Sequence, residues 1–329
     1  MRVRLKKNSK TIYVVLRVFV LITCLTLLYV FIDIEESLKM LRHLPMHIIL
    51  ICIGIFLLRN WICGLRWLTI LPSSHDQISS LGAFRYIMLG SLYGLILPGA
   101  LGGDVARSAQ VAIEQRKNKA SYVVSIWLDR LLGLFSILLL GLLATLLSPE
   151  LNNRLSFLSL MTAGLFLFVL MAWLAFHPSV HTILLRQSSR HKKLEILTTK
   201  LLSNLQVLGN YHRTHKRAAW QALGYCVPIH GLAFLVVYLL ANAIGIEIGF
   251  LTLSLFTAIS WLITSIPLSL SGVGVREISF VVLLKTQGVG AEQATSLSLG
   301  FFGVMVLVSL LGVFFLLLPN NRRLKHINL

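Results

Sequence analysis

Eight apolar segments follow one another along this chain, and most of them approach the roughly 20 residues that a membrane-spanning helix needs. Hydrophobic residues make up 56% of the 329 residues and charged residues only 13%, whereas soluble domains average about 25% charged residues. The sequence therefore predicts an all-α polytopic membrane protein whose residues 1–329 form a single integral membrane domain. The expected segments are 12–32, 46–64, 84–101, 122–147, 157–176, 219–242, 250–287 (interrupted) and 294–318.

The basic residues indicate which side of the membrane each connection faces. The formal net charge is +18, and its lysines and arginines gather in the first ten residues, after residue 107, in the loop 177–217 and in the tail. Loops rich in Lys and Arg stay in the cytoplasm, so we expect a cytoplasmic-membrane protein with both termini and the basic loop 177–217 inside. This charge also suits contact with anionic lipid headgroups, and we expect no nucleic-acid partner.

One motif occurs twice. Residues 97–107 read Leu-Pro-Gly-Ala-Leu-Gly-Gly-Asp-Val-Ala-Arg, and residues 266–277 read Ile-Pro-Leu-Ser-Leu-Ser-Gly-Val-Gly-Val-Arg-Glu. In both, a proline precedes an arginine by nine positions, and a pair of glycines (Gly102 and Gly103, Gly272 and Gly274) stands between them. Proline and glycine interrupt helices, so we expect two broken or re-entrant helices among about six to eight spans, a pattern that inverted repeats produce. The residues expected at the bends are Pro98, Gly102, Gly103, Pro267, Gly272 and Gly274.

The charge pattern tests how each broken helix is placed. A simple crossing at 84–101 would put the basic residues that follow it outside, whereas a re-entrant hairpin leaves both of its ends inside. For 250–287 the same rule allows either a second hairpin or two full spans. Both versions imply a buried polar cavity, because irregular backbone at membrane depth must be covered by protein or water.

Charged residues within the apolar segments are the candidate site. Each costs about 2.5–3.5 kcal/mol at the bilayer centre, so charges without a role are not expected there. A helix beginning near Gly103, with Arg107 beside it, suits a phosphate or another anion; alternatively, Asp104 only caps that helix. The expected substrate-binding residues are Asp104, Arg107, Asp129, Arg130, Arg276 and Glu277.

The pairing of these charges has alternatives. Arg276 and Glu277 could neutralise each other locally, or they could pair with the first motif across a pseudo-symmetric centre, which is the sharper hypothesis. Asp129 should face the bundle and find Arg130 or Arg107. Two further arginines, Arg59 and Arg66, are expected to extend to the membrane interface.

Signals of catalysis are weak. Two histidine pairs, His177 with His181 and His212 with His215, lack a carboxylate or cysteine at ligand spacing, so we expect solvated surface and no metal site. The chain has no nucleophile elbow and no Walker A lysine motif. We therefore expect no enzyme activity and no cofactor.

The sequence resembles one family through four stretches. These are LPGALGGDVARSAQ and IPLSLSGVGVREISFVVLL, with RNWICGLRW upstream and WLDRLLGL between them. They look like the lysylphosphatidylglycerol synthase transmembrane-domain family, also described as flippase-like, over about residues 12–318. One departure is Ser-Leu-Ser before Gly272, where the family pattern has Ser-Pro-Gly, which makes this bend less rigid.

The resemblance implies a function in lipid handling. In fused family members the membrane domain moves an aminoacylated phospholipid between leaflets, and a separate soluble domain, which we expect this chain to lack, transfers the aminoacyl group. It therefore implies translocation of a phospholipid, glycolipid or polyprenyl-linked lipid, with a homo-oligomer or envelope-biosynthesis proteins as possible partners. Two alternatives remain. One is a membrane-embedded glycosyltransferase, or its accessory subunit, acting on polyprenyl-phosphate-linked sugars with Asp104 or Asp129 as base or metal ligand. The other is a scaffold without transport.

Overall fold

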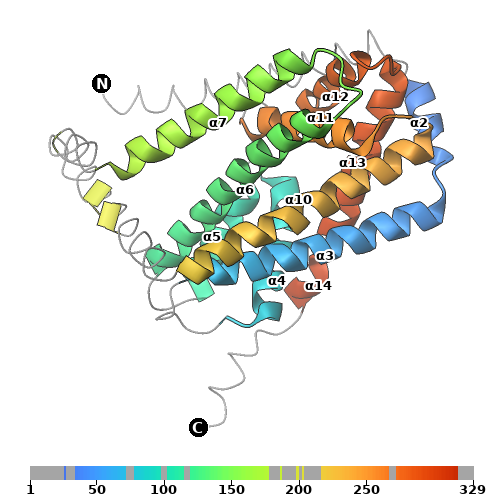
Figure 1. Ribbon diagram of the computed structural model, residues 1–329. Helices are drawn as coiled ribbons and strands as arrows, with labels where there is room; N and C mark the ends of the chain where they lie inside the picture. The colour runs from blue at the N-terminus through green and yellow to red at the C-terminus, as the bar shows by residue number, and fades with distance from the viewer. Residues whose placement is uncertain are drawn as a thin grey trace, which may run out of the picture.

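The protein is a bundle of helices (Figure 1). The computed structural model describes residues 26, 34–71, 78–97, 102–114, 119–177, 186, 198–199, 202–203, 216–266 and 272–317. Within these residues every regular element is helical, which confirms the predicted all-α class. Most of the expected segment 12–32 and of the loop 177–217 lies outside the described residues, as do Pro98 and Pro267.

Long apolar helices form the body of the bundle. Five helices among the described residues are long and apolar enough to cross a membrane, which confirms a polytopic membrane protein. Two pairs of shorter helices stand among them in the chain, α4 with α5 and α11 with α12, and α10 carries Pro228 in its interior. The five are α3 (Met46–Ile70), α6 (Lys119–Leu147), α7 (Arg154–Phe176), α10 (Lys216–Ile244) and α13 (Ala291–Leu310).

Two short helices flank this body. Helix α2 (Ile34–Arg42) packs on the start of α13, where the Ser37 hydroxyl donates a hydrogen bond to the Glu292 carbonyl at 3.3 Å. The Ser296 hydroxyl donates in turn to the Ser37 carbonyl at 3.0 Å. Helix α14 (Val313–Leu317) extends α13 after a turn and packs against α4.

The first motif joins two short helices into a hairpin. Helices α4 (Ser80–Ile96) and α5 (Gly102–Glu114) have 17 and 13 residues, fewer than the roughly 20 that a span needs. Near the bend, a Cβ added at Gly94 would lie 3.3 Å from the Gly103 Cα, so the backbones touch. At the other end, Arg85 Nη1 lies 2.9 Å from Glu114 Oε2. The chain therefore returns to the end of the bundle from which it entered.

The second motif joins another short pair, α11 (Phe250–Ser265) and α12 (Val275–Lys285), of 16 and 11 residues. Both free ends lie against the connection between α6 and α7. Ser148 and Thr252 share a hydrogen bond between their hydroxyls, and Asn152 Nδ2 donates to the Thr286 carbonyl at 3.1 Å. Of the two alternatives left open for 250–287, the structure has the hairpin.

The two hairpins enter the bundle from opposite ends (Figure 1). The open end of the first lies where α3 ends and α6 begins, because Trp67 packs edge-on against Tyr86 and donates to the Ser125 hydroxyl at 2.9 Å. The open end of the second lies where α6 ends. Since α6 runs the length of the bundle, the two bends point toward each other. This is the arrangement that inverted-topology repeats produce.

Candidate functional site

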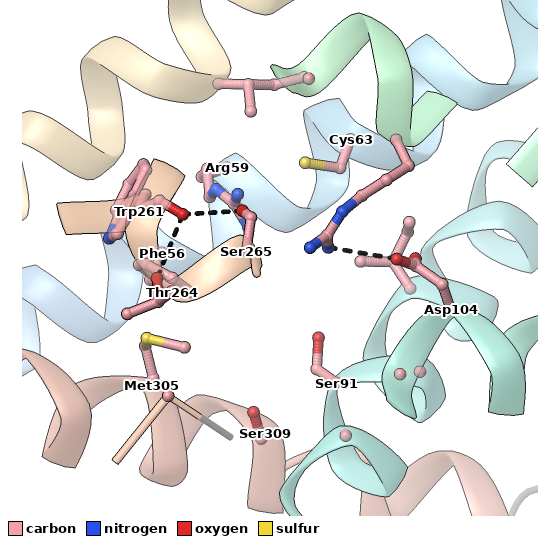
Figure 2. A pocket seen from close by; sticks show the side chains of 18 of the residues that line it. Phe56, Arg59, Cys63, Ser91, Asp104, Trp261, Thr264, Ser265, Met305 and Ser309 are labelled. Atoms are coloured by element: carbon pink, nitrogen blue, oxygen red, sulfur yellow. Dashed lines mark hydrogen bonds and ion pairs between the residues drawn. The ribbon is translucent and has the colours of Figure 1, made fainter. Parts of the chain in front are cut away.

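A cavity of about 400 Å³ lies where the two hairpins meet. Gly103, Asp104 and Arg107 line it from the first motif, and Gly272 and Arg276 line it from the second. Helices α3, α4, α6, α10, α11 and α13 supply the rest of the wall. Figure 2 shows Asp104 and Ser91 facing this space opposite Thr264 and Ser265, with Arg59 and Cys63 reaching it from α3.

Asp129, on α6, binds two arginines at once. Its Oδ1 accepts a hydrogen bond from Arg66 Nε at 2.8 Å, and its Oδ2 accepts one from Arg107 Nη1 at 3.3 Å. Arg66 also donates to the Asp129 carbonyl at 3.3 Å and to Cys226 Sγ at 3.4 Å. One buried carboxylate therefore ties α3, α5 and α6 together and neutralises only one of two guanidinium groups.

Arg107 has hydrogen-bonding capacity left over. Its side chain is 5% exposed, and its guanidinium carbon lies 4.3 Å from the centre of the Trp67 ring, a cation–π contact that orients the group. Its Nε and Nη2 are buried and find no hydrogen-bond partner among the described residues. An unpaired buried donor costs about 1–3 kcal/mol. These two nitrogens therefore favour a ligand whose acceptor atoms come within hydrogen-bonding distance.

Asp104 and Arg130 form a second pair at the cavity wall. Their Oδ2 and Nη1 atoms lie 3.2 Å apart, and their side chains are 19% and 28% exposed. Asp104 stands in the first turn of α5, where a carboxylate is favoured by the helix dipole. The distance between the two charged groups is longer, and the side chains are more exposed to solvent, than in the pair of Asp129 with Arg66.

Arg276 and Glu277 neutralise each other. Arg276 Nη2 lies 2.7 Å from Glu277 Oε1, which also accepts from Ser298 Oγ at 3.0 Å. The other carboxylate oxygen accepts from the Gly274 amide at 2.6 Å. Arg276 lines the cavity and stacks over Phe302 at 4.5 Å, while Glu277 caps the start of α12 behind it.

These contacts confirm one expectation and correct two. Asp129 pairs with Arg107, one of its two expected partners, and also with Arg66. Arg276 and Glu277 form the local pair, so the hypothesis of pairing across the two motifs is wrong: no ion pair joins them within the described residues. The expectation that Arg59 and Arg66 extend to the membrane interface is wrong, because Arg66 is 6% exposed and Arg59 lines the cavity. Both donate hydrogen bonds to acceptors inside the bundle, Asp129 and Asn60, and not to lipid headgroups.

Arg59 lines the cavity, contrary to the expectation from its place in the sequence. Its Nη1 donates to the Asn60 side chain at 3.0 Å, its guanidinium lies 5.1 Å from the Phe56 ring centre, and its Nε is buried without a partner among the described residues. It forms no ion pair within that part of the chain. No motif marks Arg59. The one indication in the sequence is that a charged residue lies within the apolar segment 46–64.

Positive charge exceeds negative charge around the cavity. Within the described residues five arginines line it, whereas two aspartates line it and one glutamate stands behind it. The arginines of the cavity therefore outnumber its carboxylates by two. The sequence 98–101 and 267–271, which joins the helices of each hairpin, contains no Asp or Glu. Such a site is suited to an anion, because charge-assisted bonds to arginine are the strong ones.

The remaining wall is largely apolar, with hydroxyl groups at intervals. Ile87, Leu134, Ile137, Trp261 and Phe301 are among its lining residues. An anionic group held by the arginines would thus lie beside surface that an acyl or prenyl chain can cover. A cavity that is charged at one part and apolar elsewhere fits an amphiphile better than a free ion.

Glycines hold both bends in place for different reasons. A Cβ at Gly103 would lie 2.7 Å from the Gly90 carbonyl oxygen, and one at Gly102 would lie 2.8 Å from Leu97, so the first bend needs glycine for close approach. Gly272 and Gly274 have φ of +78° and +83°, which residues with a Cβ adopt at a cost.

The comparisons with known proteins agree with the geometry. A family model described as the lysylphosphatidylglycerol synthase TM region matches residues 14–312, a range that contains both hairpins and every residue of the cavity wall. No curated protein and no solved structure matches the chain. The family is a membrane domain associated with lipid-related functions. On this match over most of its length, the chain belongs to the lysylphosphatidylglycerol synthase TM region family.

Proposed function

We propose that this protein translocates a phospholipid, glycolipid or polyprenyl-linked lipid across the cytoplasmic membrane by way of the cavity between its two hairpins. The observation that carries the proposal is the excess of arginine over carboxylate in a cavity with apolar walls. A lipid phosphate supplies the missing negative charge, and its tails supply the apolar surface.

The unpaired donors suggest how the phosphate is held. Arg107 offers Nε and Nη2, and Arg59 offers Nε, so three guanidinium nitrogens have no acceptor among the described residues and can donate to oxyanions. Arg276 faces the same space with its charge balanced by Glu277. Phosphate binding by Arg107 would weaken its 3.3 Å contact with Asp129, which keeps Arg66 as a partner.

The opposed hairpins suggest how the headgroup crosses. Each hairpin opens to one end of the bundle, and the two bends approach each other at the cavity. A headgroup entering beside one hairpin would leave beside the other, while its tails stay in the bilayer. The basic residues that follow α5 support a cytoplasmic location for the open end of the first hairpin, and we propose that both termini lie on the same side.

The test is translocation by the full-length protein. Proteoliposomes would carry phosphatidylglycerol labelled on an acyl chain, and a membrane-impermeant quencher would report how much label reaches the outer leaflet over time. Arg59→Gln removes an unpaired charge and leaves no carboxylate without a partner. The loss of a bond to a charged group, about 1.5–3 kcal/mol, should slow translocation at least about tenfold.

Arg42→Gln, at an exposed position of α2, is the control for loss of a positive charge elsewhere. It should translocate lipid at the wild-type rate. Equal rates for wild type, Arg59→Gln and protein-free liposomes would overturn the proposal. Formation of a glycosylated product from a polyprenyl-phosphate sugar would favour the glycosyltransferase alternative, although Asp129 is poorly placed as a base because two arginines hold its oxygens.

A further inference from the structure

We infer that His230, on α10, forms a second binding subsite of the cavity, which holds a hydroxyl group of the lipid headgroup beside the phosphate. The inference rests on the proposed lipid translocation and adds a property of the substrate: at least one free hydroxyl, such as glycerol or a sugar carries. An ester on one hydroxyl of such a headgroup leaves another free, so aminoacylated lipids keep this property. His230 belongs to neither hairpin and to none of the four stretches that carry the family resemblance.

His230 is a buried polar side chain without a hydrogen bond. It lines the cavity and is 3% exposed, and neither ring nitrogen has a partner among the described residues. The backbone of Gly133 lies beside the ring, but not with the geometry of a hydrogen bond. Buried polar groups in folded proteins are nearly always hydrogen-bonded. The partner of this ring therefore has to come from what occupies the cavity.

Aromatic side chains hold the imidazole in place. The centre of its ring lies 6.3 Å from that of Phe234 and 6.2 Å from that of Trp261. Trp261 in turn stacks on Phe234 at 5.7 Å and lies 5.8 Å from Phe301. These neighbours come from α10, α11 and α13 and fix where the ring lies. The ring can still turn about its Cβ–Cγ bond, a torsion with broad preferences, and so present either nitrogen to a ligand.

The two nitrogens of His230 differ in what they need. A neutral imidazole has one N–H donor and one acceptor nitrogen. An ionised phosphate can only accept a hydrogen bond and an ammonium group can only donate one, whereas a hydroxyl group does both. Neighbouring hydroxyls of a glycerol or sugar can therefore serve either nitrogen, so the chemistry of the ring favours a hydroxyl as its ligand.

Further groups for a phosphate and its hydroxyls lie near His230. Arg59, whose Nε is buried without a partner among the described residues, is close enough for its charge to act on the His230 ring. Thr264 and Ser265 donate to the Trp261 backbone carbonyl at 3.2 and 2.7 Å, so their oxygens can still accept. Figure 2 shows both side chains beside Trp261 at the cavity. A headgroup whose phosphate binds Arg59 would thus carry its hydroxyls to His230 and these oxygens.

The experiment compares lipids that differ only in their hydroxyls. Full-length protein would be placed in phosphatidylcholine nanodiscs with acyl-labelled phosphatidylglycerol, and unlabelled phosphatidylglycerol or phosphatidylpropanol would compete for the site. Phosphatidylpropanol has the same phosphodiester and the same three-carbon headgroup without free hydroxyls. We expect phosphatidylglycerol to compete at least about fivefold better, because it alone makes these hydrogen bonds. Equal competition would overturn the subsite and leave the proposed translocation standing, whereas failure of both lipids to compete would overturn the proposed function as well.

Phosphatidylinositol distinguishes the two sources of hydroxyls. Its headgroup is a ring of hydroxyls, like that of a sugar, and it should also compete better than phosphatidylpropanol. Stronger competition than by phosphatidylglycerol would assign the subsite to a sugar-like headgroup, and weaker competition would assign it to glycerol.

Two substitutions of His230 separate hydrogen bonding from packing. His230→Phe removes both nitrogens but keeps an aromatic ring against Phe234 and Trp261, so the preference for phosphatidylglycerol should fall to about twofold or less. Affinity for phosphatidylpropanol should not change. His230→Gln, whose amide both donates and accepts, should restore part of the preference. A wild-type preference in His230→Phe would overturn the inference, and so would its loss in both variants, because the ring would then act through its shape.

His47→Phe is the matched control. His47 is an exposed histidine on α3, and it does not belong to the cavity wall among the described residues. Its substitution should leave the ratio of the two affinities unchanged. A change as large as that of His230→Phe would overturn the inference, because the preference would then not depend on the cavity.

Discussion

The two hairpins share a motif, but their charges are held in opposite ways. The first hairpin satisfies its charges outside itself, because Arg107 binds Asp129 and Asp104 binds Arg130, both on α6. The second satisfies them within its own first turn, where Glu277 binds Arg276 and the Gly274 amide. The difference indicates that the first hairpin has contacts that a ligand can exchange, whereas the second is a fixed, neutral wall.

The strongest test of this comparison is Glu277→Ala. It leaves Arg276 buried without its carboxylate and removes the cap of α12, and breaking a buried pair costs about 3–5 kcal/mol. Asp104→Ala breaks a pair that is more exposed to solvent, so it should lower the free energy of unfolding clearly less. The measurement is thermal unfolding of the purified protein in detergent, followed by tryptophan fluorescence.

The control for this comparison is Glu35→Ala on α2. Glu35 pairs with Lys39 at 2.9 Å, but the side chains are 80% and 61% exposed, and such surface pairs contribute about 0–1 kcal/mol. If Glu277→Ala changed stability no more than Glu35→Ala does, the second hairpin would not depend on its internal pair.

A smaller effect should separate ligand binding from folding. Arg107→Gln should weaken binding of labelled phosphatidylglycerol by about 1.5–3 kcal/mol, with little loss of stability because Asp129 keeps Arg66 at 2.8 Å. Arg276→Gln should lower both binding and stability, since it leaves Glu277 without its arginine. Binding and unfolding would be measured on the same preparations. Equal losses of stability in the two variants would show that the first hairpin is no more exchangeable than the second.

The sequence predicted the parts that local patterns determine. Apolar length predicted the spans, and proline, glycine and charge predicted the two interruptions, including the hairpin around Gly102 and Gly103. The ion-pair partners of the buried charged residues were harder to predict, because they depend on which faces of which helices pack together. Arg66 and Asp129 are 63 positions apart, and nothing in the sequence of either segment indicates that α3 and α6 bring them together.

The same reason explains why Arg59 was misjudged. A lone arginine near the end of an apolar helix ordinarily extends to the interface, and only the packing of α3 against the hairpins turns it toward a cavity. The second hairpin shows the reverse case, since Arg276 and Glu277 are sequence neighbours and their local pairing was one of the alternatives that the sequence left open.

The last difference between the hairpins lies in their backbones, and Gly103→Ala tests it. The added methyl group would lie 2.7 Å from the Gly90 carbonyl oxygen, so α5 must move away from α4, at a cost of about 1–3 kcal/mol. Gly54→Ala on α3 is the control, because its Cβ would meet nothing within 4 Å. Alanine there should stabilise the helix by about 0.5–1 kcal/mol. Thermal unfolding would measure both, and headgroup binding should fall only for Gly103→Ala, because displacing α5 moves Arg107. Unchanged binding together with unchanged stability would mean that the close approach of α4 and α5 does not hold the first hairpin in place.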